Sequence, residues 1–84
     1  MGIKYRNQQE TKDLLANKIN ELSLSPKEIK IVKYRFYDFS ALKKWRSLAE
    51  VGIKFNLTRE RIRQIEEKAI SLINKKSFNN KYDY

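Results

Sequence analysis

The stretch that decides the fold is Leu57-Thr58-Arg59-Glu60-Arg61-Ile62-Arg63-Gln64-Ile65-Glu66-Glu67-Lys68-Ala69. Thr58 can accept a backbone N–H as a helix N-cap, Glu60 lies in the positive first turn, and neither Gly nor Pro follows before Ile73. At roughly 100° per residue, the apolar and polar side chains fall on opposite sides of the predicted helix. The apolar side holds Ile62, Ile65, Ala69, Leu72 and Ile73, and the polar side holds Glu60, Arg63, Gln64 and Glu67, flanked by Arg61 and Lys68.

Residues 47–56, immediately before this stretch, predict a second, short helix. Ser47 and Glu50 form the Ser-x-x-Glu pattern of a capping box. Gly52 disfavours a helix by about 1 kcal/mol relative to alanine, so its expected advantage is steric, because a missing side chain lets two helices cross closely. Asn56 tolerates the left-handed conformation that ends a helix. Most charged helix faces contact only water, but this ordered set favours a helix-turn-helix.

Residues 57–69 resemble the DNA-reading helix of domain 4 (region 4) of the sigma-70 family of bacterial transcription initiation factors, close to the housekeeping type. Three upstream segments resemble the same domain in the same order: Leu24-Ser25-Pro26-Lys27-Glu28, Tyr34-Arg35-Phe36 and Leu48-x-Glu50-Val51-Gly52. The resemblance covers about residues 14 to 73. The resemblance implies an all-α fold: a small four-helix domain with a C-terminal helix-turn-helix, of the winged-helix-like type.

The chain divides into three predicted parts. Residues 1–9 are expected to be a flexible N-terminus, residues 10–74 the helical DNA-binding domain with its helix-turn-helix at about 47–73, and residues 75–84 a flexible basic tail. Leu14, Leu15, Ile19 and Leu22 recur at helical spacing and predict a first, packing helix. Ser25-Pro26-Lys27-Glu28 combines a capping box with proline at the first helical position and starts the next helix, whose predicted inner stripe is Ile29, Val32, Lys33 and Phe36.

The predicted reading helix carries two kinds of DNA-binding side chain. For reading bases, Arg59 and Arg63 suit guanine edges, Glu60 suits a cytosine amino group, and Gln64 suits an adenine. For holding phosphates, the candidates are Thr58, Arg61, Lys68 and, by its place in the resemblance, Lys27. The resemblance also places Phe36, Ile70 and Ile73 around a cleft for the flap of the RNA polymerase β subunit, although each suits an ordinary core equally well.

The segment from Tyr37 to Arg46 departs most from the family, which usually has glycine where Tyr37 stands and a connection about two residues shorter. Its apolar side chains are Phe39, Leu42 and Trp45. One interpretation packs them on the core, with an extra helical turn through Ser40 to Lys44. The other leaves Phe39 or Trp45 exposed as a partner contact.

Composition favours binding over catalysis. The 84 residues carry a net charge of +9 and a pI near 9.9, which favour a polyanionic partner, and they contain neither cysteine nor histidine. Thiolate and imidazole metal sites and Ser-His or Cys-His nucleophiles are therefore excluded, and we expect no enzyme activity, metal or cofactor. No segment reaches the roughly 18 apolar residues of a membrane span. A cytoplasmic, nucleoid-associated protein is expected.

The predicted function is transcription initiation, with double-stranded promoter DNA at the −35 element and the β-subunit flap of bacterial core RNA polymerase as partners. An anti-sigma factor or an activator is a further possible partner, although Ser71, Leu72 and Asn74 stand where activator-contacting basic residues are often found. The alternatives are a stand-alone dimeric helix-turn-helix regulator and a phage or accessory adaptor that binds polymerase without reading DNA. The chain is either an excised fragment of a sigma factor or a naturally short, sigma-like protein.

Overall fold

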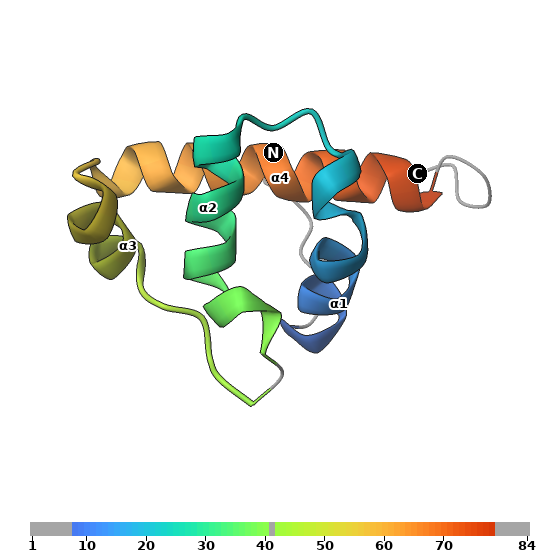
Figure 1. Ribbon diagram of the computed structural model, residues 1–84, viewed down its shortest axis with the longest axis horizontal. Helices are drawn as coiled ribbons and strands as arrows, with labels where there is room; N and C mark the ends of the chain where they lie inside the picture. The colour runs from blue at the N-terminus through green and yellow to red at the C-terminus, as the bar shows by residue number, and fades with distance from the viewer. Residues whose placement is uncertain (1–7, 41, 79–84) are drawn as a thin grey trace.

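A single long helix, α4 (Arg59–Phe78), runs across the molecule and carries the other elements on one side (Figure 1). The computed structural model describes residues 8–40 and 42–78, and in these ranges every regular element is helical. Before α4 come α1 (Gln8–Lys18), the short 3-10 turn η1 (Ile19–Glu21), α2 (Pro26–Arg35), a second 3-10 turn η2 (Tyr37–Phe39) and α3 (Leu48–Phe55). The predicted all-α, four-helix architecture is confirmed.

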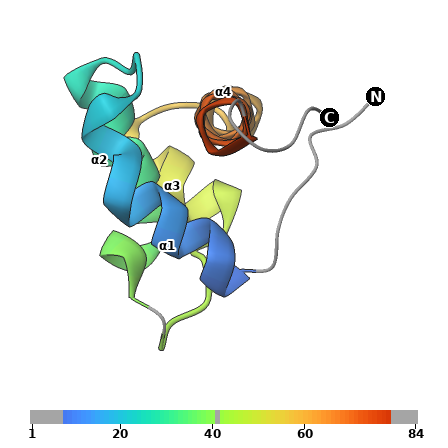
Figure 2. The same ribbon diagram turned by 90° about the vertical axis from the view of Figure 1, so that its right-hand side faces the viewer.

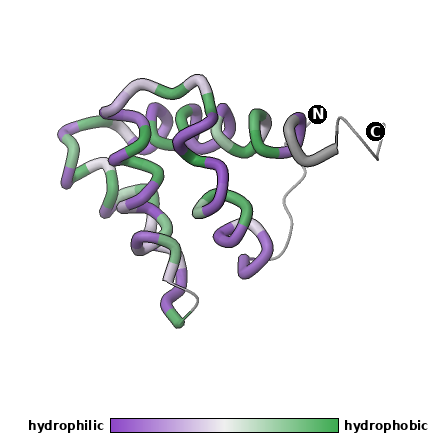
Figure 3. The backbone as a smooth tube through the Cα atoms, turned by 45° about the vertical axis from the view of Figure 1, so that its right-hand side comes forward, coloured by the Kyte–Doolittle hydropathy of each residue, from purple (hydrophilic) through white to green (hydrophobic). Residues whose placement is uncertain are grey.

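The three shorter helices form a layer against α4. Figure 2 looks along α4 and shows α1, α2 and α3 gathered on the same side of it. Apolar and polar residues alternate along each helix (Figure 3), so each can bury one face. The buried apolar side chains are Leu15, Ile19, Leu22, Ile31, Val32, Phe36, Val51, Ile62, Ile65, Ala69, Ile70 and Ile73. The predicted apolar face of α4 is therefore the face that packs, except that Leu72 is only partly buried.

One predicted detail of the packing was wrong, and one buried position was not predicted. In α2 the fully buried pair is Ile31 and Val32, whereas Ile29 is only partly buried, so the inner stripe is shifted by two residues at its start. In α1 the buried residues include Thr11 and Lys12. Lys12 is 1% exposed, a position that long charged side chains occupy only with partners.

Lys12 fixes the long connection between α2 and α3. Its Nζ donates to the carbonyl oxygen of Ser40 at 2.6 Å and also to the carbonyl oxygen of Lys43. Burial lowers the pKa of Lys12, because the charged form loses its hydration. The two carbonyl groups replace that hydration and tie the connection to α1.

The connection itself differs from the predicted helical turn through Ser40 to Lys44. The helical turn lies earlier, as η2, and Tyr37, Asp38 and Phe39 all have positive φ angles of 52°, 50° and 70°. This left-handed conformation disfavours each non-glycine residue by roughly 1 kcal/mol. The Arg46 guanidinium offsets part of this, because it lies 3.6 Å from the ring centre of Tyr37 and 3.8 Å from that of Tyr34.

The three apolar side chains of the connection take different positions. Phe39 and Trp45 pack against the core, and the Trp45 ring meets Phe36 edge-on with centroids 4.5 Å apart. Leu42 is 94% exposed. The packing interpretation is therefore confirmed for Phe39 and Trp45, and wrong for Leu42.

The predicted helix limits hold closely, with extensions at both ends of the domain. Ser25 and Ser47 each accept a hydrogen bond from the backbone N–H of the glutamate three residues later, and both capping boxes are complete. At the domain ends, α1 already includes Gln8, and α4 continues to Phe78, so residues 75–78 of the predicted tail are helical. The rest of the predicted tail, 79–84, and residues 1–7 lie outside the described residues.

The turn between α3 and α4 has the predicted conformation. Asn56 ends α3 in the left-handed region, with φ 57° and ψ 47°. The Leu57 backbone N–H then donates to the carbonyl oxygen of Gly52 at 2.8 Å. A Cβ atom on Gly52 would lie 2.5 Å from the backbone oxygen of Leu57. Only glycine therefore allows the chain to return this closely over α3.

We expect Gly52→Ala to destabilise the fold by roughly 1–3 kcal/mol, because the backbone of the turn must shift, which outweighs the higher helix propensity of alanine. Urea unfolding measures the change. Ile53→Ala is the matched control, because this neighbour in the same helix is 83% exposed and should alter stability little. Equal stability of Gly52→Ala and the wild type would show that the close approach is not required.

Candidate nucleic-acid interface

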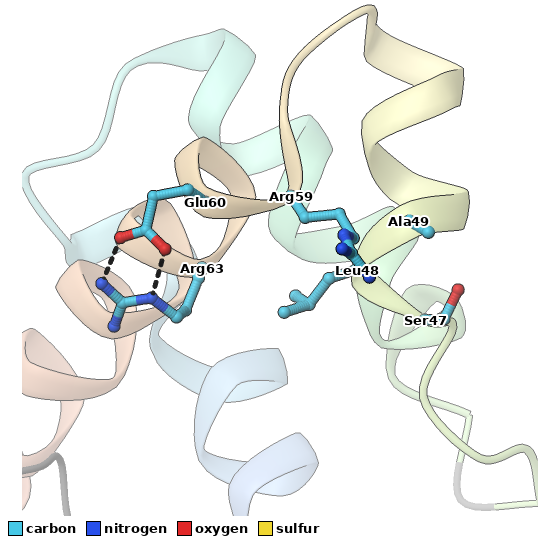
Figure 4. Close-up of a pocket in the computed structure, with 6 residues that line it drawn as sticks. All are labelled: Ser47, Leu48, Ala49, Arg59, Glu60 and Arg63. Carbon is cyan, nitrogen blue, oxygen red and sulfur yellow. Dashed lines mark hydrogen bonds and ion pairs between the residues drawn. The ribbon is translucent and has the colours of Figure 1, made fainter.

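The predicted base-reading residues lie together at the N-terminal end of α4. Arg59, Glu60 and Gln64 are exposed, and Arg63 is partly exposed. An open cleft of about 530 Å³ separates this end of α4 from the start of α3, and Figure 4 shows its lining. The lining residues are Ser47, Leu48, Ala49, Arg59, Glu60 and Arg63.

Two arginines in this cleft take opposite directions. The Arg59 side chain extends toward α3, whereas Arg63 faces Glu60 on the same helix (Figure 4). Arg63 Nε donates to Glu60 Oε1 at 3.0 Å, its second terminal nitrogen also bonds Glu60, and its first terminal nitrogen bonds Glu67. The pKa of Glu60 is lowered, mainly because Arg63 donates to its carboxylate. Of the two arginines, it is therefore Arg63 that these carboxylates hold.

Thr58 begins α4 as predicted. Its Oγ1 accepts a hydrogen bond from the Arg61 backbone N–H at 3.1 Å, which is the geometry of an N-cap. The hydroxyl hydrogen can still be donated to a phosphate oxygen. Thr58 can therefore serve both the helix and a bound backbone.

Two of the predicted phosphate-binding cations, Arg61 and Lys68, lie around Glu28, whose part in such pairing the sequence did not indicate. Glu28 Oε1 lies 3.2 Å from Lys68 Nζ, and Glu28 Oε2 lies 3.9 Å from a terminal nitrogen of Arg61. Glu28 also completes the capping box of α2, accepting from the Ser25 backbone N–H at 2.9 Å. That backbone hydrogen bond is the main reason why the pKa of Glu28 is lowered, and Lys68 and Arg61 add to it. Lys27, the fourth candidate, is exposed at the start of the same helix.

A buried ion pair fixes α2 against α4. Arg35 Nε donates to Glu66 Oε1 at 2.7 Å, and these side chains are 14% and 6% exposed. The same guanidinium donates to the carbonyl oxygen of Arg46 and lies 5.0 Å from the ring centre of Trp45. Removing one partner of such a pair leaves an uncompensated buried charge and lowers the stability of the fold by roughly 3–5 kcal/mol. Glu66 is therefore structural, and it orients α4.

Comparison with known proteins identifies the family of this chain. Residues 22–74 match the model of the family described as sigma-70, region 4. The chain belongs to this family. This agrees with the helix-turn-helix of α3 and α4, and with the exposed basic end of α4.

Three relatives show how much of a sigma factor the chain represents. The chloroplastic RNA polymerase sigma factor sigF of Arabidopsis thaliana is 39% identical over 71 residues, which are 82% of this chain and 13% of that protein. RNA polymerase sigma factor SigA of Nostoc sp. is 43% identical over 65 residues, 74% of this chain and 16% of that protein. SigA of Clostridium acetobutylicum is 52% identical over 50 residues, 57% of this chain and 12% of that protein. The chain spans less than one fifth of each relative. No solved structure matches it.

The three residues predicted for polymerase contact lie in the core of this sigma region 4 domain. Phe36, Ile70 and Ile73 are 0%, 3% and 1% exposed. Their packing role is therefore observed, and in this conformation a partner cannot touch them directly. Ile73→Asp would place a charge in the core, so it would test folding rather than polymerase binding.

The part of the chain that the structure describes was also searched for metal sites and membrane-spanning helices. No group of three or more acidic, histidine or cysteine side chains is placed to hold a metal ion. No helix among the same residues is long and apolar enough to cross a membrane.

The sequence patterns did not identify Glu28 and Glu67 as partners of the predicted DNA-binding cations. Glu67 had a local signal, because it lies four residues after Arg63 on one helix face. Glu28 is 40 residues from Lys68, and their contact depends on how α2 packs on α4.

We expect Glu28→Gln to lower stability by about 1 kcal/mol at neutral pH, because the amide keeps the cap but loses the charge beside Lys68. The folded pKa of Glu28 is depressed, so its contribution is complete above about pH 5 and is lost as the pH falls through that pKa. Thermal melting between about pH 3 and pH 7 should therefore show the variant and the wild type converging in acid. Glu21→Gln, at an exposed position of η1, is the control. A difference that persists unchanged in acid would contradict the electrostatic role.

Proposed function

We propose that this domain recognises the −35 element of promoters through the N-terminal half of α4 and binds the flap of the RNA polymerase β subunit. The observation that carries the DNA half is the exposed set of Arg59, Glu60 and Gln64 at the end of α4. In helix-turn-helix proteins this end of the second helix lies in the major groove. Here the Gly52 crossing and the Thr58 cap hold that end in place.

The proposed contacts divide into base reading and backbone binding. Arg59 and Arg63 would each donate to a guanine edge, Gln64 would pair with an adenine, and Glu60 would accept from a cytosine amino group. Lys27, Thr58, Arg61 and Lys68 would hold phosphates on either side of the groove. Glu28 supports this division, because it keeps Arg61 and Lys68 on the same side of the molecule.

Electrostatics supports a DNA partner independently of the base-reading set. The chain carries 19 basic and 10 acidic residues, and a surface this basic draws in a polyanion and binds it in a salt-dependent way. One short helix supplies few base contacts. The isolated domain should therefore bind DNA weakly, with most of its affinity coming from phosphates.

The polymerase half of the proposal rests on the relatives, whose names describe them as RNA polymerase sigma factors. Because Phe36, Ile70 and Ile73 are buried, we assign them to the support beneath the flap-binding surface rather than to the contact itself. The competing dimeric regulator needs a self-association surface. The apolar side chains of the α2–α3 connection, Phe39, Leu42 and Trp45, are the candidates for such a surface. Phe39 and Trp45 pack against the core, so of these three only Leu42 would serve it. Light scattering distinguishes the two.

We expect Gln64→Ala to weaken binding to a duplex carrying a housekeeping-type −35 element by about 1–3 kcal/mol, and to weaken binding to a scrambled duplex much less. The reason is that a lost base contact removes discrimination together with affinity. Lys27→Ala is the contrasting variant: it should weaken both duplexes about equally and reduce the salt slope by about one unit. Fluorescence anisotropy at several salt concentrations measures both. Direct reading by Gln64 would be wrong if its removal affected the two duplexes alike.

A pull-down tests the polymerase half. The immobilised domain should capture bacterial core RNA polymerase, and deletion of the flap tip should abolish capture, because the flap would supply the whole contact with this domain. Gln64→Ala is the matched control, since it alters the DNA face and should capture polymerase normally. Capture that survives deletion of the flap tip would place the contact elsewhere on the enzyme.

A further inference from the structure

Arg63, in the centre of the proposed groove-facing surface, is held between two carboxylates of its own helix. Glu60 takes Arg63 Nε at 3.0 Å together with one terminal nitrogen, and Glu67 takes the other terminal nitrogen. Glu60 is exposed, with 60% of its side chain accessible, and Arg63 and Glu67 are partly exposed, at 42% and 36%. The cluster is therefore open to DNA, and its members are paired before DNA arrives.

This pairing changes the charge that DNA meets. One arginine and two glutamates sum to a net charge of −1, although the whole chain carries +9. A phosphate that approaches the cluster is repelled by the carboxylates and must compete with them for the guanidinium. A cytosine amino group is instead a donor that Glu60 can accept, and a guanine edge offers Arg63 two acceptors without a negative charge. The cluster thus disfavours backbone contacts and tolerates base contacts.

The two neighbouring glutamates on α4 have separate partners. Glu66 is buried in its pair with Arg35, so it cannot take part in DNA binding. Glu67 lies one turn beyond Arg63 on the exposed side, and the base-reading set does not include it. Its carboxylate pairs with Arg63 across one helical turn.

We propose that Glu67 is a specificity-determining residue of this domain: together with Glu60 it holds Arg63 away from phosphates, so that Arg63 contributes to binding mainly where a guanine edge can replace the carboxylates. This inference rests on the proposed function. Binding to random DNA is dominated by phosphate contacts, so a residue that suppresses one such contact raises the ratio of specific to nonspecific affinity. Its effect is screened by salt and is largest at low ionic strength.

Glu67→Gln tests the proposal, because it removes the charge and retains the size of the side chain. Fluorescence anisotropy is measured on a −35 duplex and on a scrambled duplex of the same length, at several salt concentrations. We expect binding to the scrambled duplex to tighten by roughly two- to fivefold, the range of a partly exposed ion pair, and its salt slope to steepen by about one unit. Binding to the −35 duplex should tighten less, so discrimination falls.

Two controls separate this role from general effects of charge and folding. Glu21→Gln makes the same charge change at an exposed position of η1 and should leave the affinity ratio of the two duplexes unaltered. Arg63→Ala combined with Glu67→Gln completes a double-mutant cycle, and without Arg63 the effect of Glu67→Gln on the ratio should disappear. Thermal melting confirms that each variant folds.

The experiment distinguishes failure of the proposal for Glu67 from failure of the proposed function. If the wild type binds both duplexes equally, −35 recognition itself is wrong, and the proposal for Glu67 falls with it. If the wild type discriminates but Glu67→Gln shifts both duplexes by one common factor, as a change of net charge alone would, only the proposal for Glu67 is overturned. Persistence of its effect in the Arg63→Ala background would overturn it as well.

Discussion

The crossing of α3 over the start of α4 is the constraint on which the rest of the structure depends. The chain can return over Gly52 because that residue has no Cβ, and Asn56 supplies the left-handed conformation that turns it. This crossing sets the direction of α4, and the buried pair of Arg35 and Glu66 then fixes α4 against α2. The exposed end of α4 is therefore positioned by groups behind it, and its own side chains remain available for a ligand.

The local features of this fold could be predicted from sequence, because their causes lie within a few residues. The capping boxes at Ser25 and Ser47, the turn at Asn56 and the N-cap at Thr58 each depend on three or four consecutive positions. The positions missed depend on tertiary packing. Lys12 reaches a carbonyl group 28 residues away, and Arg35 reaches a carboxylate 31 residues away. A charged residue in a helical pattern is ordinarily assigned to the surface, so no pattern could have placed either of these inside.

The candidate site divides in the same way. Helical periodicity predicted which residues of α4 face outward, and the exposure of Glu60 and Gln64 agrees with it. Periodicity could not decide between core and contact for Ile70 and Ile73, since both roles need an apolar side chain on the inner face. The sequence also could not show how the chain turns at Tyr37 without a glycine. The turn is stabilised by the Arg46 guanidinium, which lies over the rings of Tyr34 and Tyr37.

The distribution of charge suggests how so basic a domain can be selective. Its excess of cations attracts any DNA, and attraction alone cannot distinguish sequences, because every duplex presents the same phosphates. Discrimination requires that the groups nearest the bases gain little from phosphates. Two of the cations beside the proposed groove are paired with carboxylates in this domain: Arg63 with Glu60 and Glu67, and Lys68 with Glu28. In the proposed function, Glu28, Glu60 and Glu67 therefore belong to the recognition surface, since they determine which of its cations a phosphate can engage without displacing a carboxylate.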